Sequence, residues 1–418
     1  MDLWSEFDNN LQLPPEPTVH GRTRRLTERA ILSLVREWLL LDYVSGYAHS
    51  LAATHLFKRC YWIDGLGLDG RSTRIVEAPA PELAPVVKGR KKAMAPVPLA
   101  LQPVTELAKV LLQESKPFSL YGILFEGSKR RGGEQNGVQS TPSGLTLPRE
   151  SGILRTSWLD AAPFVLKEIE QVPAVFLLNP FGAALFSADD LAQLYQRTVP
   201  SELCLLISHK QLELHLRSAL RTPELGTRLT ALLRSDRWKT LQVHDDELSA
   251  SLEKLLVLFT GAMQRHFQLP VQRLSLPLQV RPAYVEAVPY TLVFATRRQD
   301  SLLCMNDAVC LHRRRLYEQS QRGVLAEEWF IKQSQQKKEA EQHLLYQRIL
   351  QQGQAQRSRR WPDLRQHLLL ASFGQFTVQD YDQIIVQLLV QGHVRCEWRQ
   401  RSSEVLRIPS SDDTLVWL

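Results

Sequence analysis

Cysteine is scarce in this sequence and is not arranged for metal or disulfide chemistry. Five cysteines are spread over 418 residues: Cys60, Cys204, Cys304, Cys310 and Cys396. No two of them form a Cys-x-x-Cys pair, and an odd, scattered set fits neither a zinc knuckle nor a disulfide framework. We therefore expect reduced thiols and no metal site.

Long apolar runs are also missing. No stretch of 18 or more apolar residues occurs, so no membrane-spanning helix is expected. Residues 1–17 carry acids where a secretory signal needs a basic start and an apolar middle. We therefore expect a cytoplasmic protein that does not bind a membrane. The 11 histidines form no His-Glu-x-x-His motif and no Gly-x-Ser-x-Gly elbow is present, which argues against zinc and serine hydrolases.

The composition is that of an ordinary globular protein with a moderate basic excess. Hydrophobic residues make up 44% and charged residues 23%, and the length allows two or three domains. The net charge is +7. The basic residues cluster mostly where we expect loops or ends of elements: 22–25, 88–92, 129–131 and 313–315. Such clusters suit a solvated surface or phosphate contacts equally, and on the second interpretation Arg313, Arg314 and Arg315 are candidate nucleic-acid contacts.

The pattern of apolar segments predicts an α/β fold. Nearly continuous apolar runs alternate with amphipathic stretches, as expected for parallel strands covered by helices on both faces. The expected strands are residues 60–64, 118–127, 152–158, 174–180, 202–208 and 290–296. The expected helices are residues 26–47, 98–115, 160–172 and 187–198, with a largely helical insertion at 209–267. We predict a Rossmann-like, mostly parallel sheet.

The same pattern divides the chain into three parts. Residues 1–323 form the Rossmann-like domain, interrupted by mobile loops at 71–97 and 127–149 that are rich in proline, glycine and basic residues. Residues 324–356 are polar and glutamine-rich, so we expect a solvent-facing helical spacer. Residues 357–418 form a small second domain.

The order of elements in this second domain predicts a winged helix-turn-helix. A helix is expected at 361–372, a helix-turn-helix at 376–392, and two strands at 393–400 and 404–410. Residues 357–418 hold eight basic and seven acidic residues, and the apolar helix has no Lys or Arg. Candidate phosphate contacts on the strands and wing are Arg395, Arg399 and Arg401, with Arg407 beyond them. The near neutrality favours a protein partner, or weak DNA contact led by the wing, over a strongly charged reader of the major groove.

The first expected strand ends in an acid followed by a glycine-containing turn. Asp64 precedes Gly65, Gly67 and Gly70. In Rossmann-like sheets, small residues at this turn let backbone amides approach a nucleotide-type cofactor. A proline-rich segment follows instead of a helix, which favours an adenosine cofactor without pyrophosphate. The alternative is a tight turn with a capping Asp.

Polar residues also follow later strands. Glu126 ends the second expected strand, where a carboxylate can accept hydrogen bonds from ribose hydroxyls. Asp160 and Asn179 fall at the same carboxyl edge, where such sheets bind ligands. Asn179, Pro180 and Phe181 could offer acceptors and a stacking face to a planar, amino-bearing base. The alternative is that Asn-Pro starts a turn and Phe181 packs under the sheet.

Over most of its length the chain resembles the three-Cys-motif partner (TcmP) family, whose members look like class I S-adenosylmethionine methyltransferases with a C-terminal winged helix-turn-helix. The segments that carry this resemblance are YWIDGLGLDG, YGILFEGS, VFLLNPFG with SADDLAQL, and YTLVFATRRQDSLLCMNDAV. The first family motif reads like Asp-x-Phe-Ala-Gly-Pro-Gly. The residues that match it approximately are Asp64, Leu66, Gly67 and Gly70. Leu68 stands where a glycine is expected and Asp69 where a proline is expected.

The resemblance implies a site for S-adenosylmethionine along the strand ends. Asp64 and the backbone of residues 67–70 would lie near the amino-acid end of the cofactor, Glu126 at its ribose and Asp160 near adenine. The asparagine and phenylalanine of the Asn-Pro-Phe segment would hold a target base, and the asparagine would accept from its exocyclic amine. Methyl transfer is a direct displacement, so the protein supplies alignment and desolvation.

Two functions remain open. The leading one is an S-adenosylmethionine-dependent methyltransferase-like protein acting on or near nucleic acid. The other is a catalytically silent adaptor that binds nucleic acid or a protein partner in a mobile-element or defence complex. Leu68 in the first motif, and the absence of the second proline typical of amino-methyltransferases, favour the adaptor.

Overall fold

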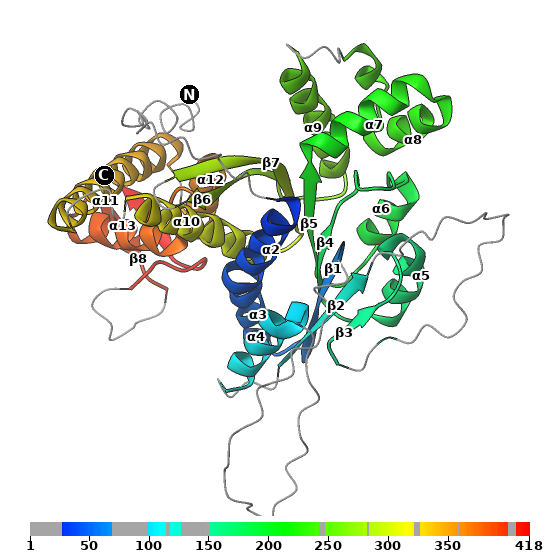
Figure 1. Cartoon of the computed structure of the whole chain (residues 1–418). Helices are drawn as coiled ribbons and strands as arrows, with labels where there is room; N and C mark the ends of the chain where they lie inside the picture. The colour runs from blue at the N-terminus through cyan, green and yellow to red at the C-terminus, as the bar shows by residue number, and fades with distance from the viewer. Residues whose placement is uncertain are drawn as a thin grey trace, which may run out of the picture.

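The computed structural model of the chain contains a central sheet covered by helices, with a smaller helical unit beside it (Figure 1). The residues it describes are 27–68, 99–113, 118–126, 147, 150–241, 247–281, 284–321, 327–357, 359–399 and 407–418. The loops expected at 71–97 and 127–149 lie outside these ranges, apart from Leu147.

Seven strands form one mixed sheet in the order β3-β2-β1-β4-β5-β7-β6. The strands are β1 (Arg59–Leu68), β2 (Ser119–Glu126), β3 (Gly152–Leu154), β4 (Ala174–Leu178), β5 (Ser201–Ser208), β6 (Gln272–Arg281) and β7 (Tyr284–Ala295). The first five are parallel, whereas β7 runs antiparallel to both β5 and β6. This arrangement confirms the predicted α/β class and the mostly parallel sheet.

Strand β6 and the first half of β7 were missed by the sequence analysis, which expected one strand at 290–296. β6 is the last strand of the sheet, and its sequence alternates polar and apolar residues around Pro277. A strand at an edge tolerates proline and need not be apolar on both sides, so it lacks the continuous apolar run of the inner strands.

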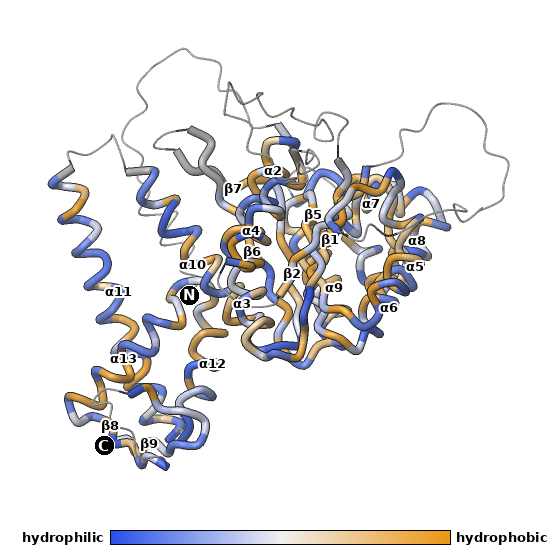
Figure 2. The backbone as a smooth tube through the Cα atoms, turned by 90° about the horizontal axis from the view of Figure 1, so that it is seen from below, coloured by the Kyte–Doolittle hydropathy of each residue, from blue (hydrophilic) through white to orange (hydrophobic). Residues whose placement is uncertain are grey.

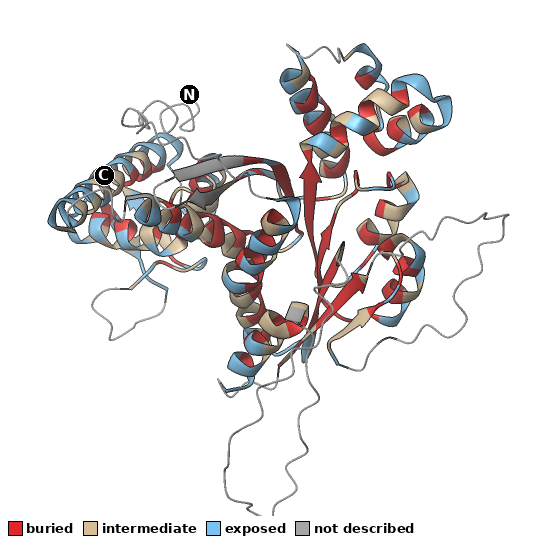
Figure 3. Cartoon of the chain, viewed as in Figure 1, coloured by how far each residue is buried: buried red, intermediate tan, exposed pale blue. Residues whose placement is uncertain are grey.

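Helices cover both faces of the sheet, and the strands between them are buried (Figure 3). One face carries α2 (Glu28–Trp38), η1 (Leu39–Val44), α3 (Ser45–Ala53), α4 (Gln102–Gln113) and α10 (Gln299–Gln321). The other carries α5 (Trp158–Glu168), α6 (Ala188–Tyr195), α7 (His209–Arg221), α8 (Pro223–Leu233) and α9 (Leu248–Gln264). In β1, Tyr61 and Ile63 join one core while Cys60 and Trp62 join the other. This double burial explains the continuous apolar runs.

The amino-terminal helix is confirmed and extends beyond the expected residue 47. The Thr27 hydroxyl accepts a hydrogen bond from the Ala30 amide at 3.3 Å and so caps the start of α2. The helix then passes through one π-helical turn, η1, before it continues as α3 to Ala53. Insertions of this kind locally reorient the side chains of a helix.

The glycine-rich turn expected at 65–70 is replaced, over its described part, by a continuation of β1 to Leu68. The pairing of β1 with β2 is irregular between Asp64 and Leu68, so the strand bends there without ending. The irregularity explains the error, because glycines at a bulge and glycines at a turn look alike in a sequence.

The C-terminal unit consists of helices and a two-stranded hairpin. Its elements are α11 (Glu327–Gln356), α12 (Trp361–Ala371), α13 (Val378–Val390), β8 (Val394–Glu397) and β9 (Thr414–Trp417). The helix-turn-helix expected within 376–392 is a single helix, and the turn lies before it, between α12 and α13. The strand that pairs with β8 is β9. Of the strand expected at 404–410, residues 407–410 are assigned to no strand and the others lie outside the described residues.

The expected spacer has two different halves. Figure 2 shows α11 leading to the C-terminal unit at a distance from the sheet domain. Its Lys337 ammonium lies 3.6 Å from the centre of the Tyr317 ring of α10. Further along, Leu345 and Ile349 of α11 are fully buried in the core of the C-terminal unit. The second half of the spacer is therefore part of that unit and does not face solvent.

Candidate functional site

The acids and the asparagine singled out from the sequence lie at the carboxyl ends of parallel strands. In the β1–β2 register Asp64 is opposite Leu124, two residues before Glu126. Asn179 directly follows β4, which pairs with β1 on its other side. The fold thus brings these segments to one edge of the sheet.

Asp64 is buried and ion-paired with an arginine from another element. Its side chain is only 1% exposed, and its Oδ2 accepts from Nε of Arg36 in α2 at 2.5 Å. Its Oδ1 accepts from Nη2 of Arg36 at 3.3 Å and from the Leu66 amide at 3.1 Å. Both carboxylate oxygens are therefore used inside the protein. The sequence analysis missed Arg36, because a single basic residue in the last turn of an amphipathic helix does not reveal its partner.

Two of the three candidate glycines have structural reasons to be glycine. A Cβ on Gly65 would lie 2.5 Å from Leu178 and 3.0 Å from Trp158, so any side chain there would collide with the core. Gly67 has a φ of +85°, and its carbonyl accepts from Nη2 of Arg36 at 2.9 Å. Gly70 lies outside the described residues.

Glu126 is partly exposed, whereas Asp160 serves its own helix. The Glu126 side chain is 27% exposed, and its one ion-pair contact given by the structure is 3.9 Å from the largely exposed Arg155. Such a surface pair is weak, which leaves Glu126 accessible. Asp160 accepts from the Ser157 hydroxyl at 2.5 Å, and Ser157 in turn caps the first turn of α5.

The Asn179-Pro180-Phe181 segment forms a compact turn. The Asn179 Oδ1 accepts from the Phe181 amide at 3.0 Å, and its Nδ2 donates to Gln211 at 2.6 Å. Phe181 is fully buried and its ring meets Phe259 of α9 edge to face, with centroids 5.2 Å apart. This geometry agrees with the alternative of a turn with a packed phenylalanine.

Two histidines of the helical insertion help to hold it on this edge. His215 shares a 2.7 Å hydrogen bond with the Gly182 carbonyl, and His209 shares one of 2.8 Å with the Thr291 hydroxyl. The pKa of His209 is lowered because burial disfavours its charged form, and the nearby Glu253 carboxylate offsets only part of this effect. Neither contact could be predicted from the sequence, because the partners belong to elements distant in the chain.

Two hollows of the described surface lie away from the strand-end residues. One of about 430 Å³ lies between α11 and α13 and is lined by Glu339, Gln342, His343, Tyr346, Gln387 and Gln391. A second of about 30 Å³ lies among α6, α8 and α9. Neither of these two hollows is lined by Asp64, Glu126 or Asn179.

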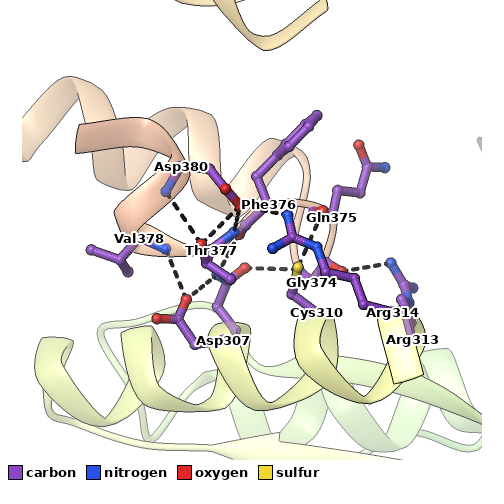
Figure 4. A network of polar contacts seen from close by, with 11 residues as sticks. Asp307, Cys310, Arg313, Arg314, Gly374, Gln375, Phe376, Thr377, Val378 and Asp380 are labelled. Carbon is purple, nitrogen blue, oxygen red and sulfur yellow. Dashed lines mark hydrogen bonds and ion pairs between the residues drawn. The ribbon is translucent and has the colours of Figure 1, made fainter. Parts of the chain in front are cut away.

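The three consecutive arginines lie in the middle of helix α10, not in a loop, and each has an internal partner. Arg313 donates to the Gly374 carbonyl at 3.0 Å and Arg314 to Asp380 at 2.6 Å (Figure 4). Arg315 donates to Asp42 of η1. These contacts fasten the C-terminal unit and the amino-terminal helix to α10.

A backbone network completes this attachment. The Val378 amide donates to Asp307 at 2.9 Å, and the Cys310 thiol lies 3.3 Å from the Gln375 carbonyl (Figure 4). Asn306, fully buried, accepts from the Gly374 amide at 2.7 Å and donates to the Phe376 carbonyl at 2.8 Å. The turn before α13 is thus held against α10 by paired, buried groups.

The arginines of the hairpin region differ among themselves in exposure. Arg395 and Arg399 are exposed, whereas Arg401 lies outside the described residues. Arg407 donates to the buried carboxylate of Asp413 at 3.1 Å. Of the four hairpin arginines, Arg395 and Arg399 are therefore the described ones that can reach an external anion.

Comparisons with protein-family models, with curated proteins and with solved structures found no match for this chain. The resemblance to the three-Cys-motif partner family therefore stays a prediction. Within the ranges that the structure describes, no three His, Cys, Asp or Glu side chains gather as a metal site would require. None of the described helices combines the length and apolar character needed to cross a membrane.

Proposed function

We propose that this chain is a catalytically silent adaptor, in which a methyltransferase-like α/β body carries a winged-helix-like unit to nucleic acid. The observation that carries the proposal is the Arg36–Asp64 pair at the end of β1. S-adenosylmethionine is a sulfonium and carries an ammonium group, so it needs accessible acceptors near that strand end. Here the carboxylate is buried and a guanidinium already satisfies both of its oxygens.

The other residues expected at a methyl-transfer site do not fit that role either. Both polar atoms of the Asn179 side chain are engaged, and Phe181 has no exposed ring face to stack on a base. Freeing Phe181 would require breaking its packing against α9, which costs about 3 to 5 kcal/mol for a buried aromatic. We therefore derive no reaction step at this edge.

The fold itself supports descent from a methyltransferase-like ancestor. The strand order β3-β2-β1-β4-β5-β7-β6, with β7 antiparallel, is the order of the class I methyltransferase sheet that the resemblance implies. An ancestral sheet kept as a rigid body, with an ion pair at the end of the first strand, accounts for both the topology and the engaged carboxylate of Asp64.

Exposed arginines of the C-terminal unit support a nucleic-acid partner. Arg395 and Arg399 belong to the hairpin region. The Arg359 carbonyl accepts from the Leu415 amide at 2.8 Å, which places the exposed Arg359 beside β9. The exposed face of α13 instead carries Gln379, Gln383 and Gln387. The hairpin would therefore contact the backbone phosphates, with the uncharged glutamine face of α13 beside it.

A second candidate, an active S-adenosylmethionine-dependent methyltransferase, is favoured by one observation: Glu126 remains accessible at the ribose position. Calorimetric titration of the purified chain with S-adenosylmethionine separates the two functions. The adaptor predicts no binding heat from the folded protein. Saturable binding that Glu126→Gln weakens, while the exposed Glu224→Gln control does not, would select the methyltransferase.

The proposal that the C-terminal unit binds nucleic acid is tested by measuring how binding to duplex DNA depends on salt. Each arginine that touches a phosphate adds about 0.9 to the steepness with which log affinity falls against log salt. Arg395→Gln/Arg399→Gln should therefore flatten the slope by about 1.8. The control Arg221→Gln/Arg228→Gln removes the same charge from the helical insertion. A wild-type response that does not depend on salt would point instead to a protein partner.

A further inference from the structure

A second group of cations lies at the opposite edge of the sheet, where α6, α8 and α9 end. Arg234 is the C-cap of α8 and Arg265 the C-cap of α9, and Arg297 follows the end of β7. His266 stands next to Arg265. We call Arg234, Arg265, His266 and Arg297 the C-cap junction. Its three arginines are exposed.

The members of the C-cap junction converge on one aromatic pair. The rings of Tyr195 and His266 stack with centroids 4.3 Å apart and an angle of 15°. Arg297 donates to the Tyr195 carbonyl, and its guanidinium lies 5.3 Å from the centre of the Phe267 ring. Arg234, Tyr195 and His266 line the same hollow of about 30 Å³.

The charge of this junction is not balanced by acids. In the described ranges no carboxylate forms an ion pair with Arg234, Arg265 or Arg297. Burial lowers the pKa of His266, and the three arginines lower it further. Nearby cations without an acid among them create a positive potential at the surface.

Helix ends account for only part of this charge. The C-terminus of a helix carries roughly half a negative elementary charge. Three helices end here, so their ends contribute a charge of about −1.5 against the charge of +3 on the three arginines. Arg297 serves this role directly, because it donates to the carbonyl of Tyr195, the last residue of α6, and to the Arg197 carbonyl at 2.8 Å. About one and a half positive charges remain for an external anion.

The neighbouring Arg197 shows what a purely structural arginine looks like in this fold. It is 8% exposed and donates to the Ile169 and Val172 carbonyls at 3.1 and 2.7 Å and to the Ser201 hydroxyl at 2.8 Å. Its guanidinium is used entirely inside the protein. The side chains of Arg234 and Arg265 have no such enclosure.

We propose that the C-cap junction contacts the phosphate backbone of nucleic acid, as a second surface separate from the hairpin. The inference rests on the proposed function for the class of ligand but on different residues. A hollow of about 30 Å³ has room for about one water and cannot enclose a free phosphate. A polyanion lying across the exposed arginines satisfies them without a deep pocket.

The test measures duplex DNA binding by fluorescence anisotropy between roughly 50 and 200 mM salt. Arg234→Gln/Arg265→Gln should flatten the salt slope by about 1.8, while Arg234→Lys/Arg265→Lys should keep it, because charge and not packing makes the contact. Arg221→Gln/Arg228→Gln on the same insertion is the matched control. Arg297 is left unchanged, since its backbone contacts support α6.

The outcomes separate this inference from the proposed function. If the matched control flattens the salt slope equally, the attraction is diffuse and the proposal that the junction contacts phosphates is overturned. No loss in Arg234→Gln/Arg265→Gln, together with a loss in Arg395→Gln/Arg399→Gln, overturns the junction but keeps the hairpin. The reverse pattern supports the junction and overturns the hairpin as the contact. Wild-type protein that binds no DNA overturns both. Should the glutamine variant fail to fold, single Arg265→Gln gives the same comparison with a slope change of about 0.9.

Discussion

Replacing Glu202 with glutamine should stabilise the protein at neutral and alkaline pH. Glu202 lies in β5, is fully buried, and accepts from the Ser301 hydroxyl at 2.7 Å, which itself contacts the Tyr43 hydroxyl at 2.8 Å. Burial raises the pKa of Glu202 from 4.5 to about 7, and hydrogen bonds from neighbours such as Ser301 offset only part of that shift. Arg298 contributes a further, smaller opposing effect.

The sign and size follow from proton linkage. The folded pKa lies above the unfolded one, so the folded state holds the proton more tightly, and this stabilisation is complete below pH 4.5. It is lost progressively as the pH rises from 4.5 through 7. A shift from 4.5 to about 7, at 1.36 kcal/mol per pKa unit, makes the loss about 3 kcal/mol. Glutamine cannot ionise, so Glu202→Gln should not show this loss.

Chemical denaturation at several pH values between about 4 and 8 measures the effect. The free energy of unfolding of Glu202→Gln minus that of the wild type should rise by about 3 kcal/mol across this range. Glu224→Gln, at an exposed position of α8, is the control and should give a flat difference. A Glu202→Gln difference that does not change with pH, or that grows as the pH falls, would refute a neutral buried Glu202.

Three further predictions concern packing and the strand-end ion pair, each measured by thermal or chemical unfolding or by fluorescence. Arg36→Met leaves the buried carboxylate of Asp64 unpaired and should cost about 3 to 5 kcal/mol, and adding Asp64→Asn should recover part of this. If the double variant is as unstable as the single one, the ion pair is not the cause. Phe181→Ala should cost about 3 to 5 kcal/mol, and a cost below about 1 kcal/mol would mean that the ring is not packed as described. Gly353→Ala drives a methyl group into the Trp417 ring and should loosen the hairpin, seen as a shift of tryptophan emission; unchanged emission would contradict this contact.

Much of the fold could be predicted because strand and helix patterns are local. β2, β4 and β5 are apolar on both faces, and the Ser187 capping position indicates the start of α6 with a capping box to Asp190. β6 could not be predicted in the same way, because an edge strand needs no continuous apolar run. β9 was missed for a similar reason: its short TLVW run is recognisable only once β8 lies beside it.

The sequence predicted where the candidate residues lie on the sheet but not which groups their side chains contact. Parallel strands place their carboxyl ends together, so the edge that holds Asp64, Glu126 and Asn179 follows from the order of elements. What each side chain contacts does not. The partner of Asp64 is 28 residues earlier in the chain, and the partners of Asn179 and Phe181 belong to a helical insertion after the next strand.

The amino-acid sequence by itself determined the class of the fold, the parallel core and the edge at which polar residues gather, because these depend on the periodicity of neighbouring residues. Only the tertiary structure decided that Arg36 neutralises Asp64, that Phe181 is buried, and that Arg313 and Arg314 fasten the C-terminal unit to α10 while Arg234 and Arg265 face solvent. The physical reason is that a charge or a ring acquires its role from whatever packs against it, and in this chain those partners come from distant segments.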